Sequence, residues 1–153
     1  MQAEGRTKER RKQMKKMTAF TAAAVMTFTL ASCGKQRYAV TYGESDIYTK
    51  SDMDSAIQAI ETKFADFKGC DLEWVYYSGD DAVTAENLKW MNELGEAQGK
   101  GRFDEVIEFE STFHTPMFGG DDAFEKNKDY EGWQWWLARE KNGEWQVMTW
   151  GFG

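Results

Sequence analysis

Glu108, Glu110 and His114 are the side chains in this sequence best suited to acid–base chemistry. They lie in the segment Phe103–Thr115, where apolar and polar residues alternate as in a β-strand. Their even spacing places all three on one face of that strand. If this face lines a pocket, the paired carboxylates could transfer protons there, and if it faces water they are ordinary surface groups. We favour the exposed face.

No other pattern indicates a catalytic or metal centre. His114 is the only histidine, and no nucleophile motif accompanies it, so we expect a structural or surface role. The acids of the connection Met117–Glu131 do not have the spacing of a calcium-binding loop. Cys70 is expected to be a small buried hydrophobic residue. We therefore expect no metal, no cofactor and no enzymatic activity.

The segment Gly132–Gly153 predicts an aromatic β-hairpin. Asn142-Gly143 lies between two aromatic runs, and this dipeptide favours a two-residue type I′ turn. Counting back from such a turn places Trp135 opposite Trp150 and Leu137 opposite Met148. We expect this face of the hairpin to be part of the core.

The second face of the hairpin carries Trp136 and Trp145, which the same register places nearly opposite each other. If nothing covers them, they form an exposed aromatic patch that could bind a protein, a peptide or a sugar. If the sheet bends tightly or Tyr38–Tyr42 folds over it, they belong to the core. Both alternatives stay open.

The first 32 residues have the organisation of an export signal. Basic residues precede Thr18–Ser32, a stretch without charge that is too short for a comfortable transmembrane helix. Leu30-Ala31-Ser32-Cys33 follows, and it resembles the lipobox of bacterial lipoproteins, which implies acylation of Cys33. Palmitate-like chains there would hold the protein on the extracytoplasmic face of the cell membrane.

This organisation sets the expected domain boundaries. Residues 1–32 form the signal peptide, and Met14-Lys15-Lys16-Met17 would itself begin an ordinary signal, so we expect Met14 to be the true start. Residues 33–47 form the lipid anchor and tether, and residues 48–153 form one globular domain.

Charge narrows the possible partners. The net charge is −7, and residues 1–32 carry seven Lys and Arg against two Glu, so the mature chain is more acidic still. Such a surface repels nucleic acid, and no basic stripe offsets that repulsion. The expected partners are the membrane, through acylated Cys33, and an envelope protein, peptide or glycan.

The periodicity of the remaining chain predicts an α+β domain. Apolar residues from Met53 to Phe67 recur at helical spacing after Ser51-x-x-Asp54, which resembles a capping box. A strand follows from Cys70 to Tyr76, and then a second helix, Ala85–Gln98, capped by Thr84. With the later strands the order is α-β-α-β-β-β.

Such an order favours two helices packed on one face of a curved antiparallel sheet. It is similar to cystatin-like and NTF2-like folds, although likeness of fold implies no function. The polar segment Gly34–Asp46 contains alternating Tyr38, Val40 and Tyr42, and it is either a linker or a short first strand.

A narrower resemblance spans most of the mature chain. Several segments resemble a group of small uncharacterised lipoproteins from Gram-positive anaerobic bacteria: Ser45-Asp46-Ile47-Tyr48, Asn87-Leu88-Lys89-Trp90-Met91-Asn92, Phe113-His114-Thr115-Pro116 and Trp133-Gln134-Trp135-Trp136. The loop Phe118–Phe124 departs from that group, and the resemblance implies no activity. We expect a membrane-anchored binding or accessory module. The alternative is an NTF2-like enzyme with a polar pocket around Glu108, Glu110 and His114.

Overall fold

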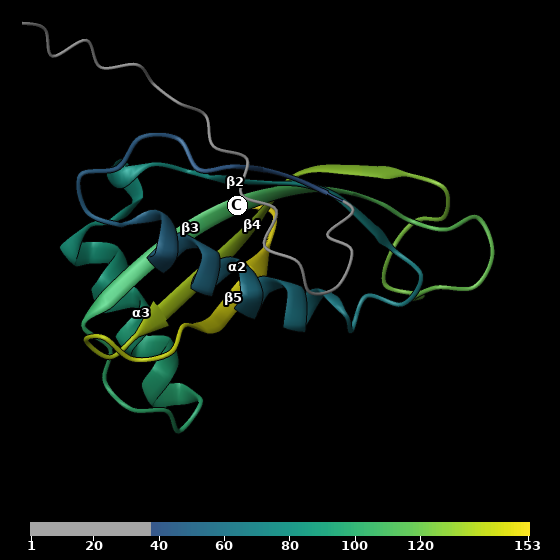
Figure 1. Ribbon diagram of the computed structural model, residues 1–153. Helices are drawn as coiled ribbons and strands as arrows, with labels where there is room; N and C mark the ends of the chain where they lie inside the picture. The colour runs from purple at the N-terminus through teal and green to yellow at the C-terminus, as the bar shows by residue number, and fades with distance from the viewer. Residues whose placement is uncertain (1–37) are drawn as a thin grey trace, which may run out of the picture. The chain divides into compact units, whose positions relative to one another are not determined.

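The computed structural model describes residues 38–153, which form an α+β domain around one five-stranded sheet (Figure 1). The sheet order follows the chain: β1 (Ala39–Thr41), β2 (Asp71–Tyr77), β3 (Glu105–His114), β4 (Asp129–Arg139) and β5 (Gln146–Gly151). Two helices, α2 (Lys50–Phe64) and α3 (Ala85–Ala97), and a 3₁₀ turn, η1 (Asp80–Ala82), complete the domain. Cys33 and the expected signal peptide lie outside the described residues.

The predicted element order is confirmed from α2 onwards, with one addition at the start of the sheet. Of the two alternatives for Tyr38–Tyr42, the structure has the strand: β1 pairs with β2 in parallel, Val40 lying opposite Val75. All other neighbouring strands are antiparallel, so the sheet is mixed rather than purely antiparallel. Within residues 38–153, no helix is long and apolar enough to cross a membrane.

Helix α2 begins two residues earlier than the sequence pattern predicted. Thr49 is the N-cap residue: its hydroxyl accepts from the backbone N–H of Asp52, whose carboxylate accepts from the Thr49 N–H in return. The capping box is therefore Thr49 and Asp52, not Ser51 and Asp54. The helix buries one apolar stripe against the sheet: Met53, Ala56, Ile57, Ile60 and Phe64.

Helix α3 begins at its predicted cap, because the Thr84 hydroxyl accepts from the Asn87 N–H. The Asn92 side chain fixes the chain after the helix: its amide donates to the Phe103 carbonyl and accepts from the Phe103 N–H. These bonds hold the residues that immediately precede β3 against α3.

The two helices pack on opposite faces of the sheet, and the expectation that they share one face is wrong. Ile107 and Leu137 belong to the cluster under α2, whereas Val106 and Ala138 pack with Met91 of α3. Adjacent residues of a strand point to opposite faces, so both faces carry apolar side chains. Figure 1 shows α2 lying across the sheet and α3 beside the beginning of β3.

The C-terminal hairpin is confirmed, but its turn and part of its register differ from the prediction. Trp135 lies opposite Trp150 as expected, whereas Leu137 lies opposite Val147 because the register shifts between Trp136 and Leu137. The turn spans Glu140–Gly143, closed by the Gly143 N–H donating to the Glu140 carbonyl, with Asn142 alone at positive φ. The connection is therefore longer than a two-residue type I′ loop.

Candidate functional site

Helix α3 covers only part of its face of the sheet, and beside it lies a pocket of about 260 Å³. Trp90 comes from α3, Gln134 and Trp136 from β4, and Thr149 and Trp150 from β5. The last three residues of the sequence complete the wall: Gly151, Phe152 and Gly153. We call this the aromatic pocket.

The rings of the aromatic pocket are unusually open to solvent for large apolar side chains. Trp90 is 38% exposed. Trp136 is half-buried: it packs against the α3 core, and its ring meets that of Trp90 edge to face at 5.3 Å. Trp150 and Phe152 also border the pocket and are exposed, but their rings lie on the α2 side: Trp150 pairs with Trp135 in the sheet, and Phe152 meets Trp133 edge to face. The rings that face the pocket on the α3 side are therefore those of Trp90 and Trp136.

The uncharged polar side chains of the aromatic pocket have no hydrogen-bond partner among residues 38–153, the part of the chain that the structure describes. There, the side chains of Gln134 and Thr149 make no hydrogen bond, and neither do the indole N–H groups of Trp90, Trp136 and Trp150. The indoles are donors only, and the amide and the hydroxyl can both donate and accept. The pocket therefore combines apolar rings with several neutral hydrogen-bonding groups.

Charged side chains occur near this pocket but not among the side chains that line it. None of its described lining residues has a charged side chain, but the Lys63 ammonium lies 4.3 Å from the centre of the Trp150 ring. Lys63 belongs to α2 on the opposite face and also pairs with Asp66 at 2.9 Å. A positive charge therefore already occupies one face of Trp150.

Glu108 and Glu110 adjoin the aromatic pocket through their neighbours on β4. Glu108 lies opposite Trp136, and Glu110 lies opposite Gln134. Glu108 is buried, whereas Glu110 is half-buried and accepts a hydrogen bond from the Tyr76 hydroxyl. The expectation that this face of the strand is exposed is therefore wrong for Glu108.

Burial gives Glu108 an unusual proton affinity. Loss of hydration and the nearby charge of Glu110 raise the pKa of Glu108 to about 7, and the Ser78 hydroxyl opposes this effect. Burial, followed by the hydrogen bond to Glu110, raises the pKa of Tyr76 to about 12. Glu108 can therefore exchange a proton near neutral pH.

The structure does not bring His114 to these carboxylates. Six residues of strand separate it from Glu108, roughly 20 Å at the rise of a β-strand. His114 Nδ1 instead lies 2.5 Å from Asp129 Oδ1 at the far end of β3, and this hydrogen bond raises the pKa of the imidazole. Glu108 and Glu110 are neighbours, and His114 is a surface residue.

Trp145 is not on the face expected for it. It is buried among the α2-side residues, its ring meets that of Tyr48 edge to face at 5.5 Å, and the Arg139 guanidinium lies 4.2 Å above it. The register shift between β4 and β5, which leaves Met148 of β5 without a partner, and the longer turn reverse the expected side of Trp145. Trp136 and Trp145 therefore lie on opposite faces, and the prediction that they could form one exposed patch is wrong.

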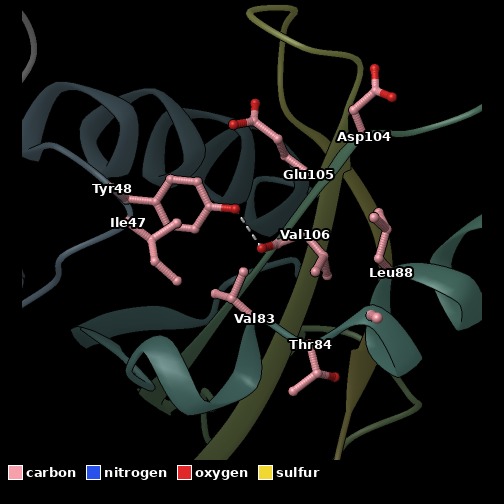
Figure 2. A pocket seen from close by; sticks show the side chains of 9 residues that line it. Ile47, Tyr48, Val83, Thr84, Leu88, Asp104, Glu105 and Val106 are labelled. Atoms are coloured by element: carbon pink, nitrogen blue, oxygen red, sulfur yellow. Dashed lines mark hydrogen bonds between the residues drawn. The ribbon is translucent and has the colours of Figure 1, made fainter.

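A second cleft, also of about 260 Å³, lies between the beginning of α3 and that of β3 (Figure 2). Its polar groups are already engaged in holding the fold. The Tyr48 hydroxyl donates to the Val106 carbonyl at 2.8 Å, Glu105 accepts from Arg139, and Asp104 accepts from the Lys141 N–H. Figure 2 shows Tyr48 reaching across the cleft to Val106. We regard this cleft as structural.

Comparison with known proteins adds no relative: no family model matches the chain, and no curated protein or solved structure is similar enough to match it. Within residues 38–153, no group of His, Cys, Asp and Glu is arranged to hold a metal ion. The site must therefore be judged from its own residues.

Sequence reasoning found Trp136 but missed Trp90. Trp90 could have been noticed, because it interrupts the polar face of the predicted helix Ala85–Gln98. Trp150 and Phe152 lie on the predicted face, with Trp135 and Trp133, but they are exposed rather than part of the core.

Proposed function

We propose that this protein is a binding module held on the extracytoplasmic face of the cell membrane by acylated Cys33, and that its ligand occupies the aromatic pocket. The observation that carries the binding proposal is the pair of rings Trp90 and Trp136 beside the uncharged side chains of Gln134 and Thr149, which have no hydrogen-bond partner among residues 38–153. Exposed aromatic clusters with a few polar groups are typical of recognition sites.

The membrane location is supported by the signal-like residues 1–32, the lipobox-like Leu30-Ala31-Ser32-Cys33 and the resemblance to small lipoproteins of Gram-positive anaerobes. It is tested by labelling cells with palmitate and comparing the chain with a Cys33→Ala variant. We expect label and membrane association only in the parent chain. Label in both, or in neither, contradicts the anchor.

The binding role is tested with the acylated full chain and the cell-envelope fraction. Protein and carbohydrate retained by the chain are compared for the parent, for Trp136→Ala and for Phe118→Ala. Phe118 is a matched control because it is 85% exposed in the loop between β3 and β4, outside the aromatic pocket. We expect Trp136→Ala alone to lose the retained material. Equal retention by all three contradicts the proposal.

An enzymatic alternative is supported by one observation, the pKa of about 7 at buried Glu108 beside Glu110. Such a carboxyl could act as a general acid or base. His114 takes no part in this alternative because it lies with Asp129. Glu108→Gln separates the two functions: a binding module retains its envelope material with this variant, whereas an enzyme loses turnover.

The NTF2-like or cystatin-like fold likewise stays a proposal. The position of α2 across the sheet supports it, whereas α3 on the opposite face is a departure from the arrangement that we expected.

A further inference from the structure

We infer that the aromatic pocket binds one neutral pyranose ring of a glycan, an inference that rests on the binding function proposed above. The ring would lie against Trp136 and Trp90, with its hydroxyl groups directed at Gln134 and Thr149. Four properties of the pocket support this ligand class: its aromatic surfaces, its polar groups, its charge and its size.

The aromatic surfaces suit a sugar because a pyranose has two apolar faces made of C–H groups. The face of an indole ring carries negative charge density, which attracts such weakly positive hydrogens, and stacking removes apolar area from water. Trp90 and Trp136 meet edge to face, so they offer two surfaces at a steep angle, 73°. One ring can therefore support the sugar face while the other meets its edge.

The polar groups suit hydroxyls, which both donate and accept hydrogen bonds. Gln134 offers an amide, Thr149 a hydroxyl and the indoles of Trp90 and Trp136 N–H donors, and among residues 38–153 none of these has a protein partner. Groups of mixed donor and acceptor character, placed around apolar surfaces, orient a ligand and make it specific.

The pocket has no charged side chain that would pair with an ionic ligand. Neither a cation nor an anion would meet an oppositely charged side chain among the described lining residues. An anionic ligand would have to approach a chain of net charge −7. A neutral ligand has neither difficulty.

The size of the pocket limits the ligand to one ring. Its volume, about 260 Å³, is below the roughly 300–1,000 Å³ of sites that enclose drug-sized molecules. We therefore expect one sugar residue to be held, with the rest of any longer chain outside the pocket.

The inference is tested by recording the indole N–H resonances of the ¹⁵N-labelled full chain in detergent micelles. The seven tryptophans give seven signals, assigned through Trp→Phe variants. The probes are N-acetylglucosamine and glucose oligomers, tetramethylammonium and a decaproline peptide. We expect a neutral oligosaccharide to shift the signals of Trp90 and Trp136. Trp74, which donates to Thr41 Oγ1 outside the pocket, serves as the internal reference and stays unchanged.

Variants make the test specific. Gln134→Ala should weaken sugar binding about 5- to 10-fold, the effect of losing one or two hydrogen bonds, whereas Phe118→Ala should leave it unchanged. Shifts caused only by decaproline or only by tetramethylammonium overturn the sugar inference and leave the binding function standing. If no probe shifts these signals, the sugar inference is also wrong. The binding function then fails only if envelope material is retained equally by Trp136→Ala.

Discussion

Arg139 Nη2 donates to Asp52 Oδ1 at 2.8 Å, which joins residues 87 positions apart in the sequence. Arg139 Nε also bonds to Glu105, and its guanidinium lies over the ring of Trp145. Asp52 is at the same time the capping-box residue of α2. One side chain at the end of β4 therefore ties the beginning of α2 to β3.

Arg139→Ala is therefore expected to destabilise the domain by about 3 kcal/mol. This is the low end of the range for breaking a buried ion pair, because Asp52 and Glu105 keep 26% and 29% of their side chains exposed. Urea unfolding measures the change. Lys89→Ala is the control, since Lys89 and Glu93 form an exposed pair at 3.6 Å that contributes at most ~0.5 kcal/mol. Equal effects of the two substitutions would show that the Arg139 network contributes no more to stability than an exposed ion pair does.

The raised pKa of Glu108 predicts that stability falls as the pH rises. The ordinary pKa of a glutamate carboxyl is 4.5 and the pKa of Glu108 in the folded chain is about 7, so the folded state binds more protons between these pH values. The free energy of unfolding therefore decreases from pH 4.5 to 7. At 1.36 kcal/mol per pKa unit, discounted because water reaches part of the surroundings of the carboxyl, the loss is about 2 kcal/mol.

Glu108→Gln isolates this contribution because it removes the titrating group and keeps the shape. The difference in unfolding free energy between the parent and this variant should change with pH from 4.5 to 7 and level off above pH 7. The pKa of His114 is raised as well, but His114 is present in both proteins, so its contribution cancels from the difference. A pH-independent difference would mean that folding does not raise the pKa of Glu108.

Gly95 is expected to be required in α3 although its backbone is helical. A Cβ added there would lie 2.8 Å from Phe103 Cε2, and Phe103 is 1% exposed. Overpacking costs about 1–3 kcal/mol, and the better helix propensity of alanine offsets about 1 kcal/mol of this. Gly95→Ala should therefore lower the unfolding free energy by about 1 kcal/mol. Glu96→Ala, on the exposed side, should change it by less than ~0.5 kcal/mol, and a stabilised Gly95→Ala would refute the packing argument.

Local patterns carried much of the fold prediction, because they depend on near neighbours. The spacing of Met53, Ile57 and Ile60 predicted α2, and the alternation of Ile107 and Phe109 predicted β3. Thr84 was recognised as a cap from its position before an apolar stripe. Each of these signals spans only a turn or a few strand residues.

Relationships between elements could not be predicted in the same way. A register shift of one residue between Trp136 and Leu137 changes which face the following residues meet, so Trp145 was placed on the wrong side. Val106 and Ala138 gave no sign that a second helix would cover them. For the same reason the aromatic pocket was only partly foreseen: its wall joins α3 to β5, 50 or more residues apart.

The occupation of the aromatic pocket in the cell is the central claim, and hydroxyl-radical footprinting measures it most directly. Oxidation is compared, residue by residue, between the chain in the intact cell envelope and the purified full chain in detergent. We predict that Trp90 and Trp136 are oxidised several-fold less in the envelope, while Trp74 and Phe118 react equally in both samples. Equal oxidation of the pocket residues in the two samples would contradict the account.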